Sequence, residues 1–145
     1  MIKKILVAID GSSHADHALD FALDLAQKYS TKMLLLTAVP PVFLTIPALK
    51  VMKSQAITDA SAELEKSYRD VLSKAEEKAK KISGLDLFTR LEHGNPDEVI
   101  IETAKLGNFD MIVVGSRGLG HRDLALGSVS SRVAENATCP VLIIK

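Results

Sequence analysis

Short apolar runs alternate with amphipathic stretches along this chain. Residues 5–9, 33–39, 111–114 and 141–144 are almost wholly apolar, which is typical of strands buried on both faces of a sheet. Residues 85–92 instead alternate apolar and polar positions, which indicates a strand with one buried face. The pattern therefore predicts five strands, and we expect the alternating one at an edge of the sheet.

Apolar residues between these strands recur every three or four positions, the period of a helix with one buried face. The predicted helices span residues 13–29, 54–83, 96–107 and 128–137. Ser13 is predicted to cap the first helix, and Asn95 with Pro96 to start the third. The buried face of the first helix is predicted to comprise Ala15, Ala18, Leu19, Ala22, Leu25, Ala26 and Tyr29.

The predicted order of elements is βαβαβαβαβ. Such alternation indicates an α/β fold, an open five-stranded parallel sheet with helices on both faces, similar to a Rossmann fold. Residues 40–53 show no clear period and contain Pro47, so we expect a loop there. A chain of 145 residues suits one domain, residues 1–145.

Composition and charge exclude several classes of protein. Eighteen basic residues balance eighteen acidic ones, so no basic excess indicates a nucleic-acid partner. The single cysteine, Cys139, excludes an internal disulfide framework and a cysteine-based zinc site. No stretch approaches the roughly 18 apolar residues of a membrane span, so we expect no membrane partner and a cytoplasmic location.

Candidate binding residues follow the first and fourth predicted strands, where ligands of open α/β sheets bind. Asp10-Gly11-Ser12 follows the first strand, and a glycine-rich segment from Gly115 to Ser128 follows the fourth. Glycines allow close backbone approach to a phosphate, and the serines near residue 128 lie at a helix N-terminus, which favours anions. A solvated glycine-rich surface turn would have the same composition, so both interpretations remain open.

Common catalytic and nucleotide-binding motifs are not found. The chain has no Gly-Lys-Ser/Thr sequence of a Walker A loop, and Gly118-Leu119-Gly120 lacks the third glycine of a dinucleotide fingerprint. No nucleophile–base pair stands out, and there is no Gly-x-Ser-x-Gly elbow. His14 and His17 lie three residues apart, but no carboxylate signature accompanies them to indicate a metal site.

Four blocks of the sequence resemble the universal stress protein family, in its ATP-binding branch. They are residues 1–12, residues 110–118, residues 126–130 and residues 139–144, and together they span nearly the whole chain in the right order. The family pattern places nine residues between the second glycine and the final Gly-Ser/Thr. Here only eight residues separate Gly118 from Gly127, so the resemblance implies a tighter connecting loop.

The resemblance implies strand order 3-2-1-4-5 and a site for an adenine nucleotide, ATP or AMP/ADP. It implies that the main chain near Val39 meets adenine, and that Asp10 lies near the ribose or a phosphate-bound Mg²⁺ or Mn²⁺ ion. The remaining implied contacts are Ala8, Ile9, Gly115, Ser116, Arg117, Gly118, Leu119, Gly120, His121, Gly127, Ser128, Val129 and Ser130. A turn-capping role for Asp10 is the alternative that the residues themselves leave open.

The last predicted strand carries an unbroken apolar run at an expected sheet edge. Exposed edges of this kind favour pairing with another chain, so we expect a homodimer through Val141, Leu142, Ile143 and Ile144. The resemblance to universal stress proteins implies the same pairing through the last strand. The resemblance therefore implies a dimeric, nucleotide-binding regulatory or stress-response module. A slow ATP hydrolase and a nucleotide-independent dimeric scaffold remain the alternatives.

Overall fold

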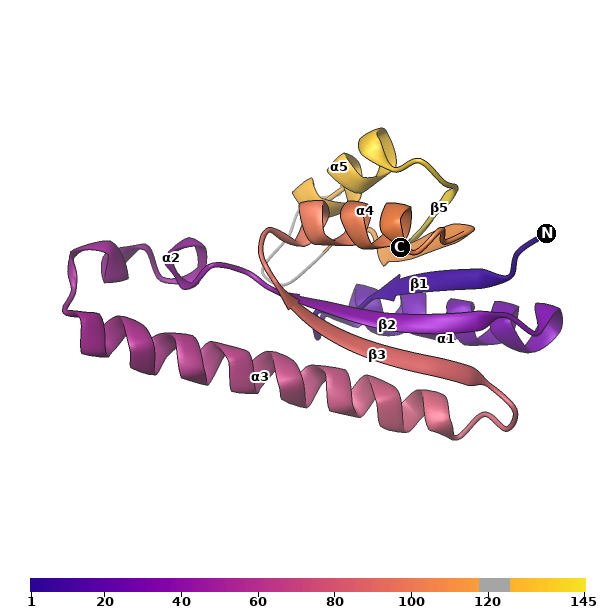
Figure 1. Cartoon of the computed structure of the whole chain (residues 1–145), viewed down its shortest axis with the longest axis horizontal. Coiled ribbons are helices and arrows are strands. Elements are labelled where there is room, and N and C mark those ends of the chain that lie inside the picture. The colour runs from indigo at the N-terminus through magenta and orange to yellow at the C-terminus, as the bar shows by residue number, and fades with distance from the viewer. Residues whose placement is uncertain (118–125) are drawn as a thin grey trace.

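Five parallel strands form one sheet with helices on both faces in the computed structural model, which describes residues 1–117 and 126–145 (Figure 1). The strand order is β3-β2-β1-β4-β5, as predicted. The strands are β1 (Lys4–Ala8), β2 (Lys32–Val39), β3 (Asp86–His93), β4 (Met111–Gly115) and β5 (Val141–Ile144). Strands β2 and β3 therefore lie on one side of β1, and β4 and β5 lie on its other side.

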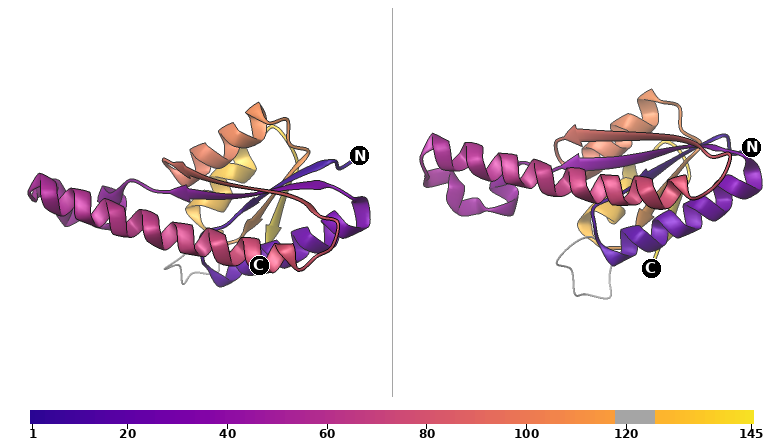
Figure 2. Two further views of the ribbon diagram at one scale, coloured as in Figure 1. Left: turned by 60° about the horizontal axis from the view of Figure 1, so that its bottom comes forward. Right: turned by 90° about the horizontal axis from the view of Figure 1, so that it is seen from below.

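Two apolar cores lie on opposite faces of the sheet. Helices α1 (Ser13–Tyr29) and α3 (Ser54–Lys80) cover one face, and α4 (Pro96–Leu106) and α5 (Ser128–Asn136) cover the other (Figure 2). Because side chains alternate along a strand, Ile5 and Val7 enter the first core while Leu6 enters the second. This two-sided burial explains why β1, β2 and β4 are continuously apolar.

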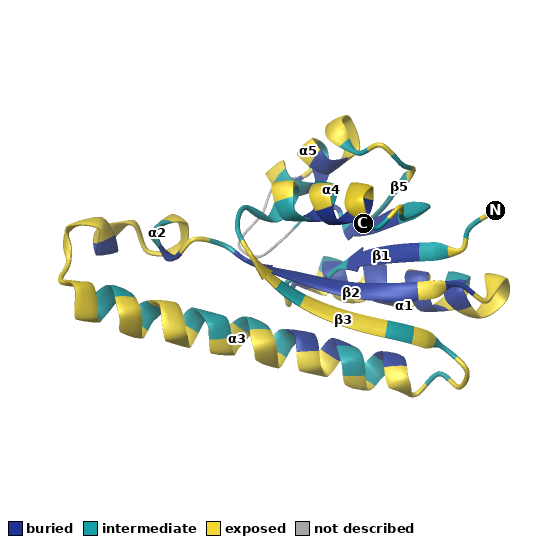
Figure 3. Cartoon of the chain, viewed as in Figure 1, coloured by how far each residue is buried: buried dark blue, intermediate teal, exposed yellow. Residues whose placement is uncertain are grey.

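Strand β3 lies at one edge of the sheet, as its alternating sequence predicts. Most of its side chains are exposed, and Leu87 and Leu91 alone are partly buried (Figure 3). Phe88 points outward and keeps 53% of its surface exposed. The other edge strand, β5, is more covered, because its side chains are partly buried and Ile144 is fully so.

Two local predictions about α1 are wrong. Ser12, not Ser13, is the N-cap of α1, because its hydroxyl accepts the Ala15 N–H at 3.1 Å. Tyr29 is 56% exposed, since α1 ends there and the chain turns away through Ser30 at φ 53°. Leu23 is buried on this helix instead.

The segment expected as a loop, residues 40–53, contains two short helices. They are α2 (Val42–Thr45) and the 3₁₀ helix η1 (Pro47–Val51), where Pro47 suits the first helical position. Val42 and Leu49 are buried. Elements of four or five residues are too short to produce a helical period, which explains why the sequence pattern missed them.

The buried residues of helix α3 all lie in its C-terminal half, although Glu65 of the first half pairs with His93 at the end of β3 at 2.7 Å. Its buried residues are Leu72, Ala75 and Ala79, while residues 54–70 include none. With α2 and η1, this first half extends beyond the sheet (Figures 1 and 2). Within the two described ranges, no helix is both long enough and apolar enough to cross a membrane.

Candidate functional site

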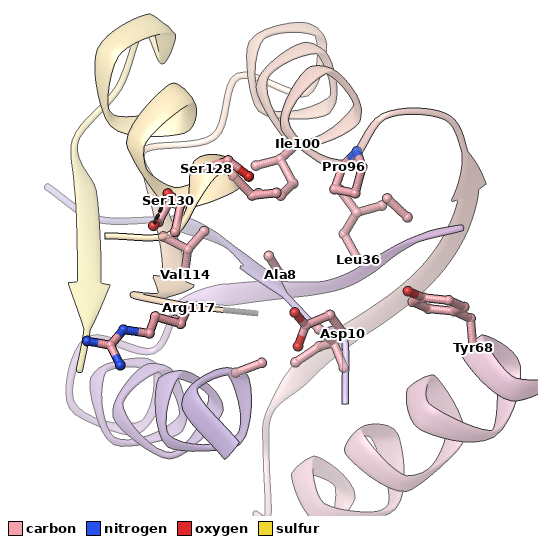
Figure 4. A pocket seen from close by; sticks show the side chains of 16 residues that line it. Ala8, Asp10, Leu36, Tyr68, Pro96, Ile100, Val114, Arg117, Ser128 and Ser130 are labelled. Carbon is pink, nitrogen blue, oxygen red and sulfur yellow. Dashed lines mark hydrogen bonds between the residues drawn. The ribbon is translucent and has the colours of Figure 1, made fainter. Parts of the chain in front are cut away.

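A pocket lies at the carboxyl ends of the neighbouring strands β1 and β4 (Figure 4). The strand order of the sheet reverses between these two strands. This is where open parallel sheets bind ligands. A larger hollow of about 510 Å³ lies beside Pro40 and Ser61, away from this switch point. The pocket is lined by Ala8, Ile9, Asp10, Ala15, Leu36, Ala38, Tyr68, Pro96, Ile100, Val114, Gly115, Arg117, Gly127, Ser128, Val129 and Ser130.

The turn after β1 places the carboxylate of Asp10 in this pocket (Figure 4). One carboxylate oxygen accepts the Ser12 N–H at 2.8 Å, which is an Asx-type turn. Gly11 between them has φ +86°, a conformation that side-chain-bearing residues rarely adopt. Asp10 therefore caps its own turn, as the alternative interpretation expected, and still presents its carboxylate to the pocket.

The end of β4 and the start of α5 are held together by hydrogen bonds. The Ser116 carbonyl accepts the Gly127 N–H at 2.7 Å and the Ser130 hydroxyl at 2.8 Å. The Ser116 N–H in turn donates to the Ile144 carbonyl at 2.7 Å. Ser130 is buried and serves this junction, whereas Ser128 is exposed at the first position of α5. The N-terminus of α5 is thereby fixed at the pocket.

The N-termini of α4 and α5, two of the helix starts at the pocket, differ in charge. Pro96 opens α4, where Asn95 occupies the N-cap position but its side chain forms no capping hydrogen bond. The first turn of α4 carries Asp97 and Glu98, whose negative charges oppose an anionic ligand. The first turn of α5 has no acidic residue, and no side chain caps it. Free N–H groups and the helix dipole therefore favour an anion at α5.

The middle of the pocket is apolar. The side chains of Ala8, Leu36, Ile100 and Val114 line it, from three strands and α4. A flat heteroaromatic group could bury its faces there, while its polar substituents reach the rim. The site thus combines an apolar slot, a carboxylate and an anion-favouring helix end.

Gly115 allows α1 to approach the end of β4 closely. A Cβ atom built on Gly115 would lie 2.7 Å from the His14 carbonyl carbon and 2.8 Å from the Ala15 nitrogen. Both are backbone atoms, so a side chain here would displace the start of α1. Packing of α1 against β4 therefore requires glycine at this position.

The structure brings together most of the predicted site residues that it describes: Ala8, Ile9, Asp10, Gly115, Arg117, Gly127, Ser128, Val129 and Ser130. The Arg117 side chain points away from Asp10 (Figure 4). Ser116 lies outside the lining and fastens the junction described above. Gly118, Leu119, Gly120 and His121 fall outside the described residues.

Val39 is placed outside this pocket, beside the hollow near Pro40, and its carbonyl accepts the Gly94 N–H at 3.0 Å. Its neighbour Ala38 lines the pocket instead. Since side chains alternate along β2, the residue before Val39 faces the opposite side of the sheet.

Sequence reasoning missed Tyr68 as a pocket residue. It belongs to the apolar stripe of α3, so its spacing predicts a core residue. Burial, and then the negative charge of Asp10, raise the pKa of Tyr68 above its ordinary value. The phenol consequently keeps its proton at neutral pH and is a hydrogen-bond donor beside Asp10.

Comparisons with known proteins agree with this geometry. The chain matches the universal stress protein family over residues 1–145. Universal stress protein YxiE of Bacillus subtilis is 36% identical over 149 residues, covering all of both chains. The structure of universal stress protein UspA from Lactobacillus plantarum is 26% identical, with a TM-score of 0.84, covering 99% of this chain and 97% of that one. A universal stress protein in complex with cAMP is 28% identical, with a TM-score of 0.72 and the same coverage. The chain belongs to the universal stress protein family.

Proposed function

We propose that this chain binds an adenine nucleotide in the pocket between β1 and β4 and acts as a dimeric regulatory or stress-response module. One observation carries the proposal: an apolar slot lies between the Asp10 carboxylate and the acid-free N-terminus of α5. A nucleoside phosphate has matching parts, a flat base, a hydroxylated sugar and an anionic phosphate. The relative crystallised with cAMP supports an adenine ligand.

The described residues suit the first phosphate of the nucleotide best. Ser128 and the N–H groups of the first turn of α5 would hold it. A divalent ion would arrive with a di- or triphosphate, because Mg²⁺ is usually held by one or two carboxylates together with substrate phosphates. Asp10 supplies one carboxylate to the pocket. No cluster of three or more His, Cys, Asp or Glu able to hold a metal occurs within residues 1–117 and 126–145.

Calorimetric titration with AMP and adenosine tests nucleotide binding. We expect both ligands to bind at one site, and AMP to bind more tightly because α5 interacts with its phosphate. ATP with and without Mg²⁺ extends the series to longer phosphate chains. Absence of binding by AMP and ATP alike would contradict the proposal.

We infer that the second copy of the dimer pairs with β5. The carbonyls of Pro140 and Ile144 accept N–H groups of the β4 side, from Ile112 and Ser116. In a parallel ladder alternate residues face opposite neighbours, so Val141 and Ile143 direct their backbone groups away from β4. Within residues 1–117 and 126–145 these outward N–H and C=O groups have no hydrogen-bond partner, and a second β5 strand could pair with them.

Replacing Ile143 with proline should convert the dimer to a monomer, because proline removes an outward N–H that the β4 ladder does not use. Sedimentation velocity measures the change. Ile143→Ala is the matched control, since it shortens the same side chain and keeps the N–H, and it should remain dimeric. A monomeric wild type, or a proline variant that stays dimeric, would exclude this interface.

A further inference from the structure

Tyr68 is the contribution of α3 to the lining of the pocket, and its side chain is half-buried. Its hydroxyl points into the pocket, on the side where Asp10 lies and away from the start of α5 at Ser128 (Figure 4). The pocket therefore has two separate regions. One, at the start of α5, favours a phosphate, and the other contains one phenol and one carboxylate.

The position of Tyr68 is fixed by the packing of α3. Leu72 lies one turn further along the helix and Ala75 about two turns, and both are buried against the sheet. No residue from 54 to 70 is buried, so Tyr68 lies where the packed half of α3 begins to leave the sheet. A ring held in this way presents its hydroxyl at a defined place, which is what a selective contact requires.

The two groups have complementary hydrogen-bonding capacity. The protonated phenol of Tyr68 donates a hydrogen bond, and the carboxylate of Asp10 accepts one. A sugar hydroxyl both donates and accepts, so it can bond to the two groups at once. Where two hydroxyls are adjacent, as on the 2′ and 3′ carbons of ribose, one can bond to the phenol and the other to the carboxylate.

Resting on the proposed nucleotide-binding function, we propose that Tyr68 contacts the ribose of the bound nucleotide and, with Asp10, distinguishes ribonucleotides from 2′-deoxyribonucleotides. The phenol O–H donates to the 2′-hydroxyl oxygen, and that hydroxyl or its 3′ neighbour donates to the Asp10 carboxylate. A deoxynucleotide leaves the phenol without this partner. Sites that hydrogen-bond a ligand hydroxyl discriminate against the analogue that lacks it.

Affinities for AMP and 2′-deoxy-AMP in three proteins test this inference. The wild type should bind AMP more tightly than 2′-deoxy-AMP. Tyr68→Phe keeps the ring and removes the hydroxyl, so its AMP affinity should fall about 3- to 10-fold, the range for one neutral hydrogen bond, while its 2′-deoxy-AMP affinity stays unchanged. Tyr29→Phe is the matched control, since Tyr29 is exposed on α1, and it should behave like the wild type.

The outcomes separate this inference from the proposed function. If the wild type binds neither these two ligands nor ATP, the proposed function fails. If the wild type binds AMP and Tyr68→Phe retains the full preference for AMP, the nucleotide function stands and the sugar contact is overturned. An equal loss for both ligands would also overturn it, because that pattern assigns the phenol to a part of the ligand other than the 2′-hydroxyl.

Tyrosine fluorescence gives an independent readout. The chain has two tyrosines and no tryptophan, so Tyr29→Phe leaves Tyr68 as the single emitting residue. Saturation with AMP should change this emission more than saturation with 2′-deoxy-AMP. Equal changes with both ligands would contradict a contact to the 2′-hydroxyl.

Discussion

Replacing Gly115 with alanine is expected to destabilise the chain by about 3 kcal/mol, the upper end of the usual range for overpacking a well-packed site. The added Cβ would lie 2.7 Å from the His14 carbonyl carbon and 2.8 Å from the Ala15 nitrogen, closer than Cβ atoms approach other atoms in folded proteins. This steric overlap can be relieved only if the first turn of α1 moves. That turn forms one wall of the pocket, so nucleotide binding should weaken together with stability.

Urea denaturation of Gly115→Ala, compared with the wild type, measures this effect. Gly84→Ala is the control, because a Cβ at Gly84 meets no atom within 4 Å and the residue has φ +77°. Its free energy of unfolding should fall only by the strain of that backbone conformation, about 1 kcal/mol. A free energy of unfolding for Gly115→Ala equal to that of the wild type would show that α1 does not approach β4 as described.

Replacing Ser128 with glutamate should reduce AMP affinity more than about 100-fold and leave adenosine affinity nearly unchanged. Two like charges about 4 Å apart repel by about 4 kcal/mol at an effective dielectric constant of about 20. Ser128 is exposed at the first position of α5, where a carboxylate suits the helix dipole. The variant should therefore fold normally, and the loss should be specific to the ligand that carries a phosphate.

Calorimetry with AMP and adenosine on the same variant measures both affinities. Ser131→Glu is the matched control, because it adds the same charge to the same helix three residues on, outside the pocket lining. It should lose much less AMP affinity. Equal losses in the two variants, or a parallel loss of adenosine binding, would show that the phosphate does not lie at the start of α5.

The sheet could be predicted from the sequence because its pattern is dictated by burial. Strands β1, β2 and β4 are covered on both faces and must be apolar throughout, whereas β3 at the edge alternates. The short helices α2 and η1 could not be predicted, because elements this short leave no period. The exposure of Tyr29 depends on where α1 ends, which periodicity does not determine.

Within the site, residues at strand ends and helix starts could be predicted, and residues contributed across the fold could not. Asp10 and Ser128 follow buried strands, so the rule for open sheets places them together. Tyr68 comes from a helix whose stripe predicts only burial, and it reaches the pocket because α3 crosses near the end of β1. Ala38, next to Val39, lines the pocket, and contact between adenine and the main chain near Val39 stays a prediction.

Binding of an adenine nucleotide between β1 and β4 can be tested by an amide NMR titration of the wild type with AMP. We expect saturable shifts of the amide signals of Asp10, Gly115, Ser128 and Val129, with little change along the exposed edge strand β3. No shifts at saturating AMP, or shifts confined to the hollow lined by Arg90, Glu102 and Thr103, would contradict it.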